Sequence, residues 1–84
     1  MMRLYSNLPT IDLHGETREV AVILVKNFIS DNMKLKNEKI VVVHGKGTGI
    51  VRKAVHNALK SDKRVSSFKL DNFNDGQTII ELIL

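Results

Sequence analysis

The sequence contains no cysteine in its 84 residues. Disulfides, thiolate metal sites and cysteine nucleophiles are therefore excluded, and the absence is compatible with a reducing compartment. Aromatic residues make up only 5% of the chain, so stacking of nucleobases on aromatic rings is not the expected mode of recognition. No apolar run approaches the roughly 18 residues that a membrane-spanning helix needs, and residues 1–10 lack the apolar core of an export signal. We therefore expect a cytoplasmic protein without a membrane partner.

Negative charge is the scarcer sign, because 13 lysines and arginines face 9 aspartates and glutamates, which gives a formal net charge of +4. This balance favours an anionic partner, and nucleic acid is the simplest one. Hydrophobic residues make up 43% of the chain and charged residues 26%, as in ordinary globular proteins, and the length suffices for a single core. We expect a short N-terminal arm over residues 1–9 and one domain over residues 10–84.

Hydrophobic spacing predicts alternating strands and helices. Strands are expected over residues 10–13, 39–43, 65–70 and 77–84, helices over 17–33 and 49–61, and polar turns over 34–39 and 72–76. Thr17 is expected to cap the first helix, since its hydroxyl can accept a backbone N–H of the first turn. The order β-α-β-α-β-β, with helical crossovers between the first three strands and a hairpin between the last two, predicts a two-layer α/β sandwich.

The first helix carries more apolar residues than one buried stripe requires. The stripe is formed by Ala21, Leu24, Val25, Phe28 and Ile29, and it is widened by Val20, Val22 and Ile23. The wide face indicates either a thick core helix or a self-association surface. A monomer and a weak homodimer both stay open.

The segment Asp12-Leu13-His14-Gly15 ends the first expected strand. Side chains two residues apart point to the same side of a strand, so Asp12 and His14 can project together. A carboxylate beside an imidazole fixes its tautomer and supports general acid or base catalysis. The same pair can ligate a metal ion, with Mg²⁺ on Asp12 as one option. The spacing also fits a polar pair that simply ends a strand.

The segment His44-Gly45-Lys46-Gly47-Thr48-Gly49, called the glycine segment below, lies between the second expected strand and the second helix. Alternating glycines let a ligand approach the backbone closely, and a helix start offers free N–H groups and a partial positive charge that suit a phosphate. Lys46 adds a mobile positive charge, and Thr48 can cap the helix or donate to the anion. The spacing matches neither a Walker loop nor a dinucleotide-binding fingerprint, which argues against an ATPase or a dehydrogenase. A glycine-rich turn with a threonine cap is the alternative.

Both segments follow the carboxyl ends of their strands. If the two strands are parallel neighbours, the segments meet at one sheet edge, where ligands of open α/β sheets bind. The residues brought together there would be Asp12, His14, His44 and Lys46, with Arg52 and Lys53 extending the site along the second helix.

The remaining histidine and the aromatic residues also have expected positions. His56 lies among basic residues of the second helix and is expected to be solvated at the surface. Phe28 and Phe68 are expected in the core, which leaves Tyr5 and Phe73 as the aromatic side chains available for stacking.

The two segments resemble signatures of the small MutS-related (Smr) domain family. Residues 11–15, Ile-Asp-Leu-His-Gly, are similar to the first signature, and residues 44–49 followed by Arg52 are similar to the second, in the same β/α order. The third signature, Gly-Gly-x-Gly-x-Thr, is matched in part by residues 73–78, where Gly76 and Thr78 agree. The resemblance covers residues 10–84.

The resemblance implies an α+β fold with a mixed four-stranded sheet, similar to the carboxyl-terminal domain of translation initiation factor 3. It also implies nucleic-acid binding and endonuclease activity on DNA or RNA, with Asp12 and His14 serving cleavage. Substrate binding is implied for residues 44–49 and Arg52.

Three functions are consistent with these residues. The first is a phosphodiester endonuclease with His14 as acid or base, in which RNA needs no cofactor and DNA favours Mg²⁺ on Asp12. The second is a non-catalytic module that binds nucleic acid or the ribosome. The third is a small protein that binds a single mononucleotide at the glycine segment.

Overall fold

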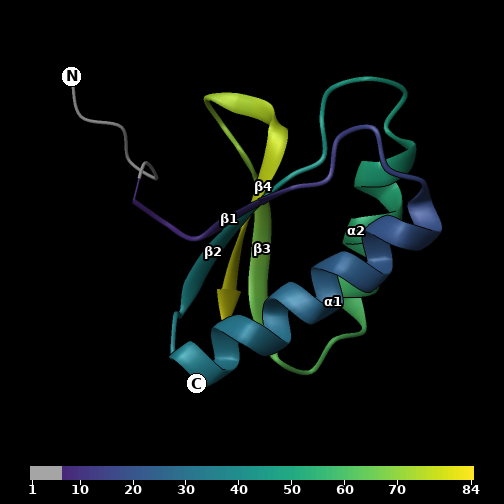
Figure 1. Ribbon diagram of the computed structural model, residues 1–84. Coiled ribbons are helices and arrows are strands. Elements are labelled where there is room, and N and C mark those ends of the chain that lie inside the picture. Colours follow the sequence, from purple (N-terminus) through teal and green to yellow (C-terminus); the bar gives the residue numbers. More distant parts are fainter. Residues whose placement is uncertain (1–6) are drawn as a thin grey trace.

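The computed structural model describes residues 7–84, which form a four-stranded sheet and two helices (Figure 1). The elements are β1 (Thr10–Asp12), α1 (Arg18–Leu35), β2 (Lys39–Val43), α2 (Ile50–Lys60), β3 (Val65–Asp71) and β4 (Asn74–Leu82). Their order confirms the β-α-β-α-β-β arrangement that hydrophobic spacing predicts. Most of the expected N-terminal arm, including Tyr5, lies outside the described residues.

The strand order across the sheet is β1-β2-β4-β3. β1 pairs with β2 in parallel, whereas β4 runs antiparallel to both β2 and β3, so the sheet is mixed. Crossovers between parallel strands are almost always right-handed, and those through α1 and α2 advance in the same direction across the sheet. Both helices therefore lie on one face (Figure 1), and the expected two-layer sandwich is confirmed.

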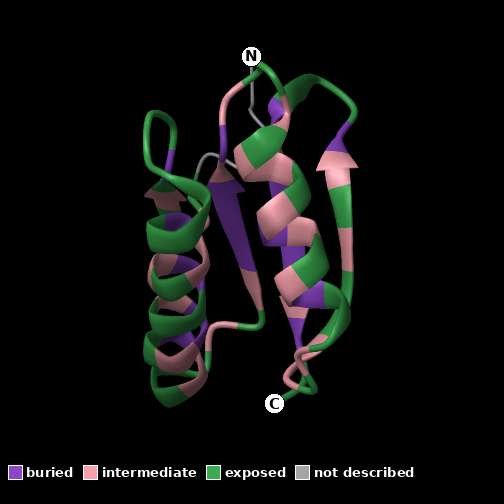
Figure 2. Ribbon diagram, turned by 90° about the vertical axis from the view of Figure 1, so that its right-hand side faces the viewer, coloured by how far each residue is buried: buried purple, intermediate pink, exposed green. Residues whose placement is uncertain are grey.

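The core lies between the helices and the facing side of the sheet. α1 contributes Ala21, Val25 and Ile29, which are spaced by four residues and are 0% exposed. β2 contributes Ile40 and Val42 to the same cluster. Figure 2 faces the helix layer and shows the exposed residues on the outer sides of the helices, with buried strand residues behind them. The run of apolar residues in β2 is thus buried.

Both ends of α1 have a local cause. The Thr17 hydroxyl accepts the Val20 N–H at 3.2 Å, which confirms the predicted cap. The helix ends at Leu35 because Lys36 adopts the left-handed conformation, with φ of 60°. The Lys36 N–H donates to the carbonyl oxygens of Asn32 and Met33 in the last turn. The helix is therefore slightly longer than the range 17–33 expected from spacing.

The predicted widening of the buried stripe of α1 is wrong for Val20 and Ile23, which are 40% and 59% exposed. Successive helical residues lie about 100° apart, so Ile23 falls on the side opposite Ala21 and Val25. Val22 is half-buried. Within residues 7–84, neither helix is both long and apolar enough to span a bilayer.

The hairpin of β3 and β4 turns at Asn72 and Phe73 alone, so the prediction of a loop over residues 72–76 is wrong. The buried carboxylate of Asp71 holds the turn, because it accepts the Phe73 N–H at 2.9 Å and a Gln77 side-chain N–H at 2.7 Å. The segment after the turn continues as strand and pairs back onto β3. The hairpin tip thereby reaches the end of the sheet at which β2 gives way to the glycine segment (Figure 1).

Candidate functional site

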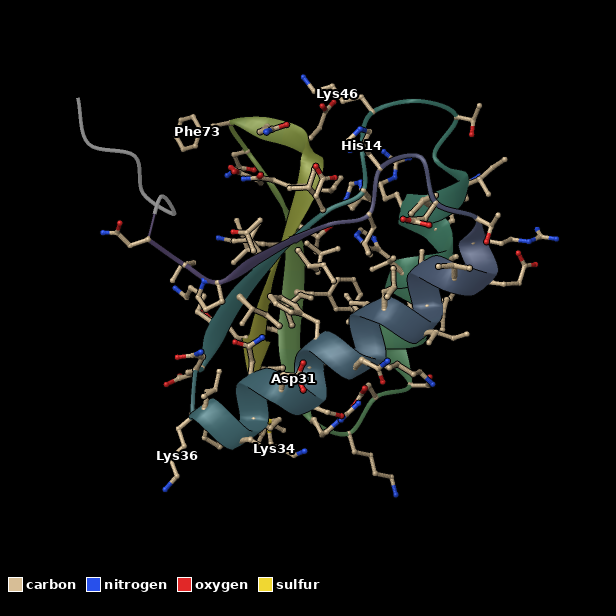
Figure 3. The ribbon with its side chains drawn as sticks, in the orientation of Figure 1. His14, Asp31, Lys34, Lys36, Lys46 and Phe73 are labelled. Carbon is tan, nitrogen blue, oxygen red and sulfur yellow. The ribbon has the colours of Figure 1, made fainter. Side chains whose placement is uncertain are left out.

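The two histidine-glycine segments meet at one edge of the sheet, as the sequence predicts. β1 and β2 are parallel neighbours, and where both strands end the Leu13 N–H donates to the Val43 carbonyl at 2.6 Å. A Cβ atom built on Gly45 would lie 3.3 Å from the His14 Cβ, so the second segment passes directly against the first. Figure 3 shows His14 and Lys46 at this end of the molecule.

Asp12 and His14 form a hydrogen-bonded pair on the solvent side of this edge. Asp12 Oδ1 accepts from the His14 ring at Nδ1, 2.6 Å away, and from the His14 backbone N–H at 3.1 Å. The bond to the carboxylate raises the pKa of the His14 imidazole above its ordinary value and lowers the pKa of Asp12. Since Nδ1 carries the proton shared with Asp12, Nε2 is the ring atom left for a substrate. The His14 side chain is 69% exposed, so a substrate can reach it.

A cleft of about 440 Å³ opens beside this pair. Its walls are the segments His14–Arg18 and His44–Arg52, so it includes the N-terminal turns of both helices. Within the described part of the chain, the backbone N–H groups of residues 46–49 donate to no other residue. Unpaired N–H groups and the positive ends of helix dipoles favour an anion of phosphate size.

β4 supports the glycine segment from its inner side. The Gly76 carbonyl accepts the N–H groups of His44 and Gly45, both at 2.9 Å. A Cβ on Gly76 would lie 3.2 Å from Lys46 Cγ and 3.6 Å from the Gly45 carbonyl carbon, so β4 packs closely against the segment. The Asp75 carboxylate lies 3.5 Å from the Lys46 ammonium. The sequence signalled this contact only through the partial third signature, in which Gly76 is one of the matching residues.

The imidazole of His44 is buried, whereas its place in the segment predicted that it would face a bound anion. His44 is only 5% exposed, its Nδ1 lies 3.0 Å from the Gly45 carbonyl oxygen, and its Nε2 lies 2.8 Å from Thr78 Oγ1. Burial lowers the pKa of the ring, which keeps it neutral. The His44 side chain thus links the glycine segment to β4 on the buried side of the segment.

The prediction that His56 is a solvated surface residue is wrong. Its Nε2 lies 2.7 Å from Thr78 Oγ1, and its ring packs against His44 and Phe68 with centroids 5.8 and 5.0 Å apart. Burial lowers the pKa of this ring as well. Arg52 and Lys60, four residues away on either side, suggested a basic helix face, whereas the partner Thr78 comes from a distant strand.

Of the two cationic residues of α2 that were expected to extend the site, Arg52 and Lys53, only Arg52 lines the cleft. Arg52 borders the cleft, and its guanidinium lies over the start of α2, since a Cβ on Gly49 would be 3.1 Å from Nη2. Lys53 is exposed and does not line the cleft. Gly49, not Thr48, occupies the cap position of α2, with φ of 83°, and the Thr48 hydroxyl accepts the Ile50 N–H at 3.4 Å.

The donor set offers little to a Mg²⁺ ion. Among residues 7–84, no group of three or more histidines and carboxylates is arranged to hold a metal ion. Asp12 uses Oδ1 for His14, which leaves one carboxylate oxygen for a cation. Mg²⁺ is usually bound by one or two carboxylates together with substrate phosphates. These residues do not form a metal centre of their own, and we assign no step to a metal ion.

The chain is similar in sequence to a known domain family and to larger proteins. The sequence model of the Smr domain matches residues 11–82. A protein named Endonuclease MutS2 from Acetivibrio thermocellus is 37% identical over 75 residues, which cover 86% of this chain and 10% of that protein. The Endonuclease MutS2 of Symbiobacterium thermophilum is 40% identical over 68 residues, which cover 81% of this chain and 9% of that protein. The chain thus spans about a tenth of the length of these relatives.

Two solved structures share the fold. The Smr domain of Thermus thermophilus MutS2 has a TM-score of 0.89 at 32% sequence identity, over 92% of this chain and 100% of that one. YdaL, a stand-alone small MutS-related protein from Escherichia coli, has a TM-score of 0.82 at 21% identity, over 87% of this chain and 63% of that one, and supports the fold alone. With its two helices on a mixed four-stranded sheet and its matched signatures, the chain belongs to the Smr domain family.

Proposed function

We propose that this Smr domain binds nucleic acid by its phosphates and cleaves phosphodiester bonds. The observation that carries the proposal is the Asp12–His14 pair beside a cleft lined with unpaired backbone N–H groups. The net charge of +4 supports an anionic polymer as the ligand. The relatives named Endonuclease MutS2 support cleavage as the activity.

In the proposed complex, the glycine segment binds one phosphate of the polymer. The N–H groups of residues 46–49 donate to its oxygens, and the start of α2 adds the positive end of its dipole. Arg52 and Lys46 neutralise part of the phosphate charge from the two sides of the segment. These donors also stabilise the additional negative charge that develops on the phosphate during cleavage.

His14 is the proposed general base. Its Nε2 takes the proton of a ribose 2′-hydroxyl, the 2′-oxygen bonds to phosphorus, and the bond from phosphorus to the 5′-oxygen breaks, while the departing 5′-oxygen takes up a proton from water. Asp12 holds the ring in the Nδ1–H tautomer and stabilises the positive charge that the ring acquires. RNA is therefore the polymer that this set of side chains can cleave unaided, because RNA carries its own nucleophile.

The experiment that tests the proposal is a cleavage panel of labelled single-stranded, duplex and branched RNA and DNA, with and without Mg²⁺. Cleavage of RNA without Mg²⁺ is expected, together with affinity that falls steeply with salt, because phosphate binding releases counterions. Binding without cleavage would instead assign a non-catalytic module for nucleic acid or the ribosome. Thermal stabilisation by mononucleotides but not by oligonucleotides would assign a mononucleotide-binding protein.

Arg52 and Lys53 provide a matched pair for the binding surface, since they are neighbours on α2 and only Arg52 lines the cleft. Arg52→Gln is expected to weaken RNA binding by about tenfold or more, as charge-assisted hydrogen bonds contribute roughly 1.5–3 kcal/mol. Lys53→Gln is expected to change affinity less than about twofold. Fluorescence anisotropy at several salt concentrations measures both, and equal losses in the two variants would contradict a phosphate site in the cleft.

Phe73 offers a way to test whether the bound RNA is single-stranded. It is 82% exposed at the hairpin tip, and Figure 3 shows its ring pointing away from the body of the molecule. We expect it to stack on an unpaired base, a contact worth about 1–3 kcal/mol per base. The chain has no tryptophan, so Phe73→Trp supplies a single tryptophan, which can be excited apart from Tyr5 and whose emission single-stranded RNA should quench. Ile23→Trp, on the exposed side of α1, is the control. Equal quenching of both variants, or of neither, would rule out stacking at the hairpin tip.

A further inference from the structure

Three side chains from different elements form a continuous hydrogen-bonded chain behind the glycine segment. His44 follows β2, Thr78 belongs to β4 and His56 to α2. Thr78 Oγ1 lies 2.8 Å from His44 Nε2 and 2.7 Å from His56 Nε2, and His44 Nδ1 lies 3.0 Å from the Gly45 carbonyl oxygen. Thr78 is 0% exposed, so its hydroxyl bonds to the two rings without competition from water.

The donors and acceptors of this chain fit one arrangement of protons when both rings are neutral. A carbonyl oxygen only accepts, so His44 Nδ1 carries the proton and donates to Gly45. His44 Nε2 then accepts the Thr78 hydroxyl proton, and Thr78 Oγ1 accepts from the protonated Nε2 of His56. Both rings are neutral because burial lowers their pKa values. Positive Arg52 disfavours a second proton on either ring, Lys60 disfavours one on His56, and Asp75 acts in the opposite sense on His44.

The end of the chain fixes the orientation of one peptide group. The peptide between Gly45 and Lys46 is trans, so its carbonyl and its N–H point in opposite directions. Because the carbonyl is held by the His44 ring in the interior, the Lys46 N–H points away from that ring. Lys46 lines the cleft, and its N–H donates to none of residues 7–84.

We propose that Thr78 and His56 are positioning residues that act through His44 to aim the Lys46 backbone N–H at a phosphate oxygen in the cleft. The proposal rests on the proposed function, since it requires a phosphate of the substrate at the glycine segment. It assigns roles to two side chains that do not contact the substrate. It also gives a purpose to the hydrogen bonds by which two histidines from separate parts of the chain, His44 and His56, share the Thr78 hydroxyl.

Thr78→Val tests the proposal, because valine keeps the shape of threonine and removes the hydroxyl. We expect the His44 ring to change from the Nδ1–H tautomer to a mixture, as seen in its ¹⁵N chemical shifts. We also expect the Lys46 amide signal to lose its response to a 2′-O-methyl RNA oligonucleotide that cannot be cleaved. On cleavable RNA, kcat should fall by about tenfold or more with little change in KM, because a misaimed donor fails mainly in the transition state. Thr78→Ser restores the hydroxyl and should restore all three measurements.

A second pair of variants covers the case in which Thr78→Val does not fold. His56→Leu removes the donor to Thr78 and should produce the same changes, whereas His56→Gln keeps an N–H near the Nε2 position and should reverse part of them. Thr10→Val, which removes an exposed hydroxyl from β1, is the control.

Two results overturn the proposal, and they are distinguishable. If the wild-type Lys46 amide responds to RNA and the response is unchanged in folded Thr78→Val or His56→Leu protein, the positioning role is wrong while the proposed function stands. If wild-type protein shows no amide response to any RNA or DNA, the proposed function fails and the positioning role fails with it.

Discussion

His14→Ala is expected to reduce RNA cleavage by about 10²- to 10⁴-fold, the range that a general acid or base contributes. The side chain is 69% exposed and is not part of the core cluster, so the variant should fold and bind RNA almost as well as the wild type. Single-turnover cleavage at saturating protein measures the chemical step apart from binding. Asp31→Asn, an exposed carboxylate at the opposite end of the molecule (Figure 3), is the control for a surface substitution.

Asp12→Asn gives the same prediction a pH dependence. The hydrogen bond from Asp12 raises the pKa of His14, so removing the negative charge should lower that pKa. A general base must be deprotonated, and the rate therefore rises as pH passes the pKa of His14. In Asp12→Asn the rise should occur at lower pH and reach a lower plateau, since the neutral amide stabilises the imidazolium less. NMR titration of His14 checks the pKa independently of cleavage. An unshifted titration, or His14→Ala cleaving within about twofold of wild type, would remove this pair from the mechanism.

Gly45→Ala is expected to be the most damaging substitution in the glycine segment. Gly45 has φ of 85°, where a Cβ costs roughly 1–3 kcal/mol, and that Cβ would also lie 3.3 Å from the His14 Cβ. The variant should lose stability and also displace His14, so cleavage should fall beyond what unfolding explains. Urea unfolding midpoints and cleavage rates together measure the two effects.

Alanine substitutions at two other glycines distinguish the cost of a positive φ from the cost of a close contact. Gly15 has φ of 83° with no atom within 4 Å of its built Cβ, so Gly15→Ala should show the cost of strain alone. Gly47 has neither a positive φ nor a neighbour within 4 Å, so Gly47→Ala should leave stability unchanged or raise it by about 0.4–1 kcal/mol through a less flexible unfolded chain. Equal losses of stability in Gly45→Ala and Gly47→Ala would contradict the described contact between the two segments.

The elements predicted correctly are those whose cause is local in sequence. The Thr17 cap depends on a backbone N–H three residues away, and β2 is marked by its own apolar run. The parallel pairing of β1 and β2 follows from the crossover rule once α1 is recognised. The turn over residues 72–76 was predicted from residue types alone. It failed because the buried Asp71 carboxylate, which bonds as far as Gln77, allows those residues to continue the strand.

In the candidate site, too, contacts between residues near in sequence could be predicted, and contacts between distant residues could not. Asp12 and His14 are two residues apart on one strand end, so their pairing could be predicted from spacing. The partners of His44 and His56 could not, because Thr78 is separated from them by 34 and 22 residues and reaches them only through the order of strands in the sheet. The sequence also grouped Arg52 with Lys53, although neighbours on a helix point about 100° apart and only one of them can line the cleft.

The position of β4 has a consequence for how the domain assembles. β4 follows every other element in the chain, yet it lies between β2 and β3 and pairs with both. Until β4 is in place, β2 has one unpaired edge and β3 has no partner strand, so the sheet cannot form in the order in which the chain is synthesised. Such pairings between distant segments are slow steps in folding, and open strand edges expose intermediates to aggregation. Gly76 and Thr78 belong to β4, so the contacts that support the segment His44–Gly49 form only in the same late step that closes the sheet, and a partly folded chain lacks them.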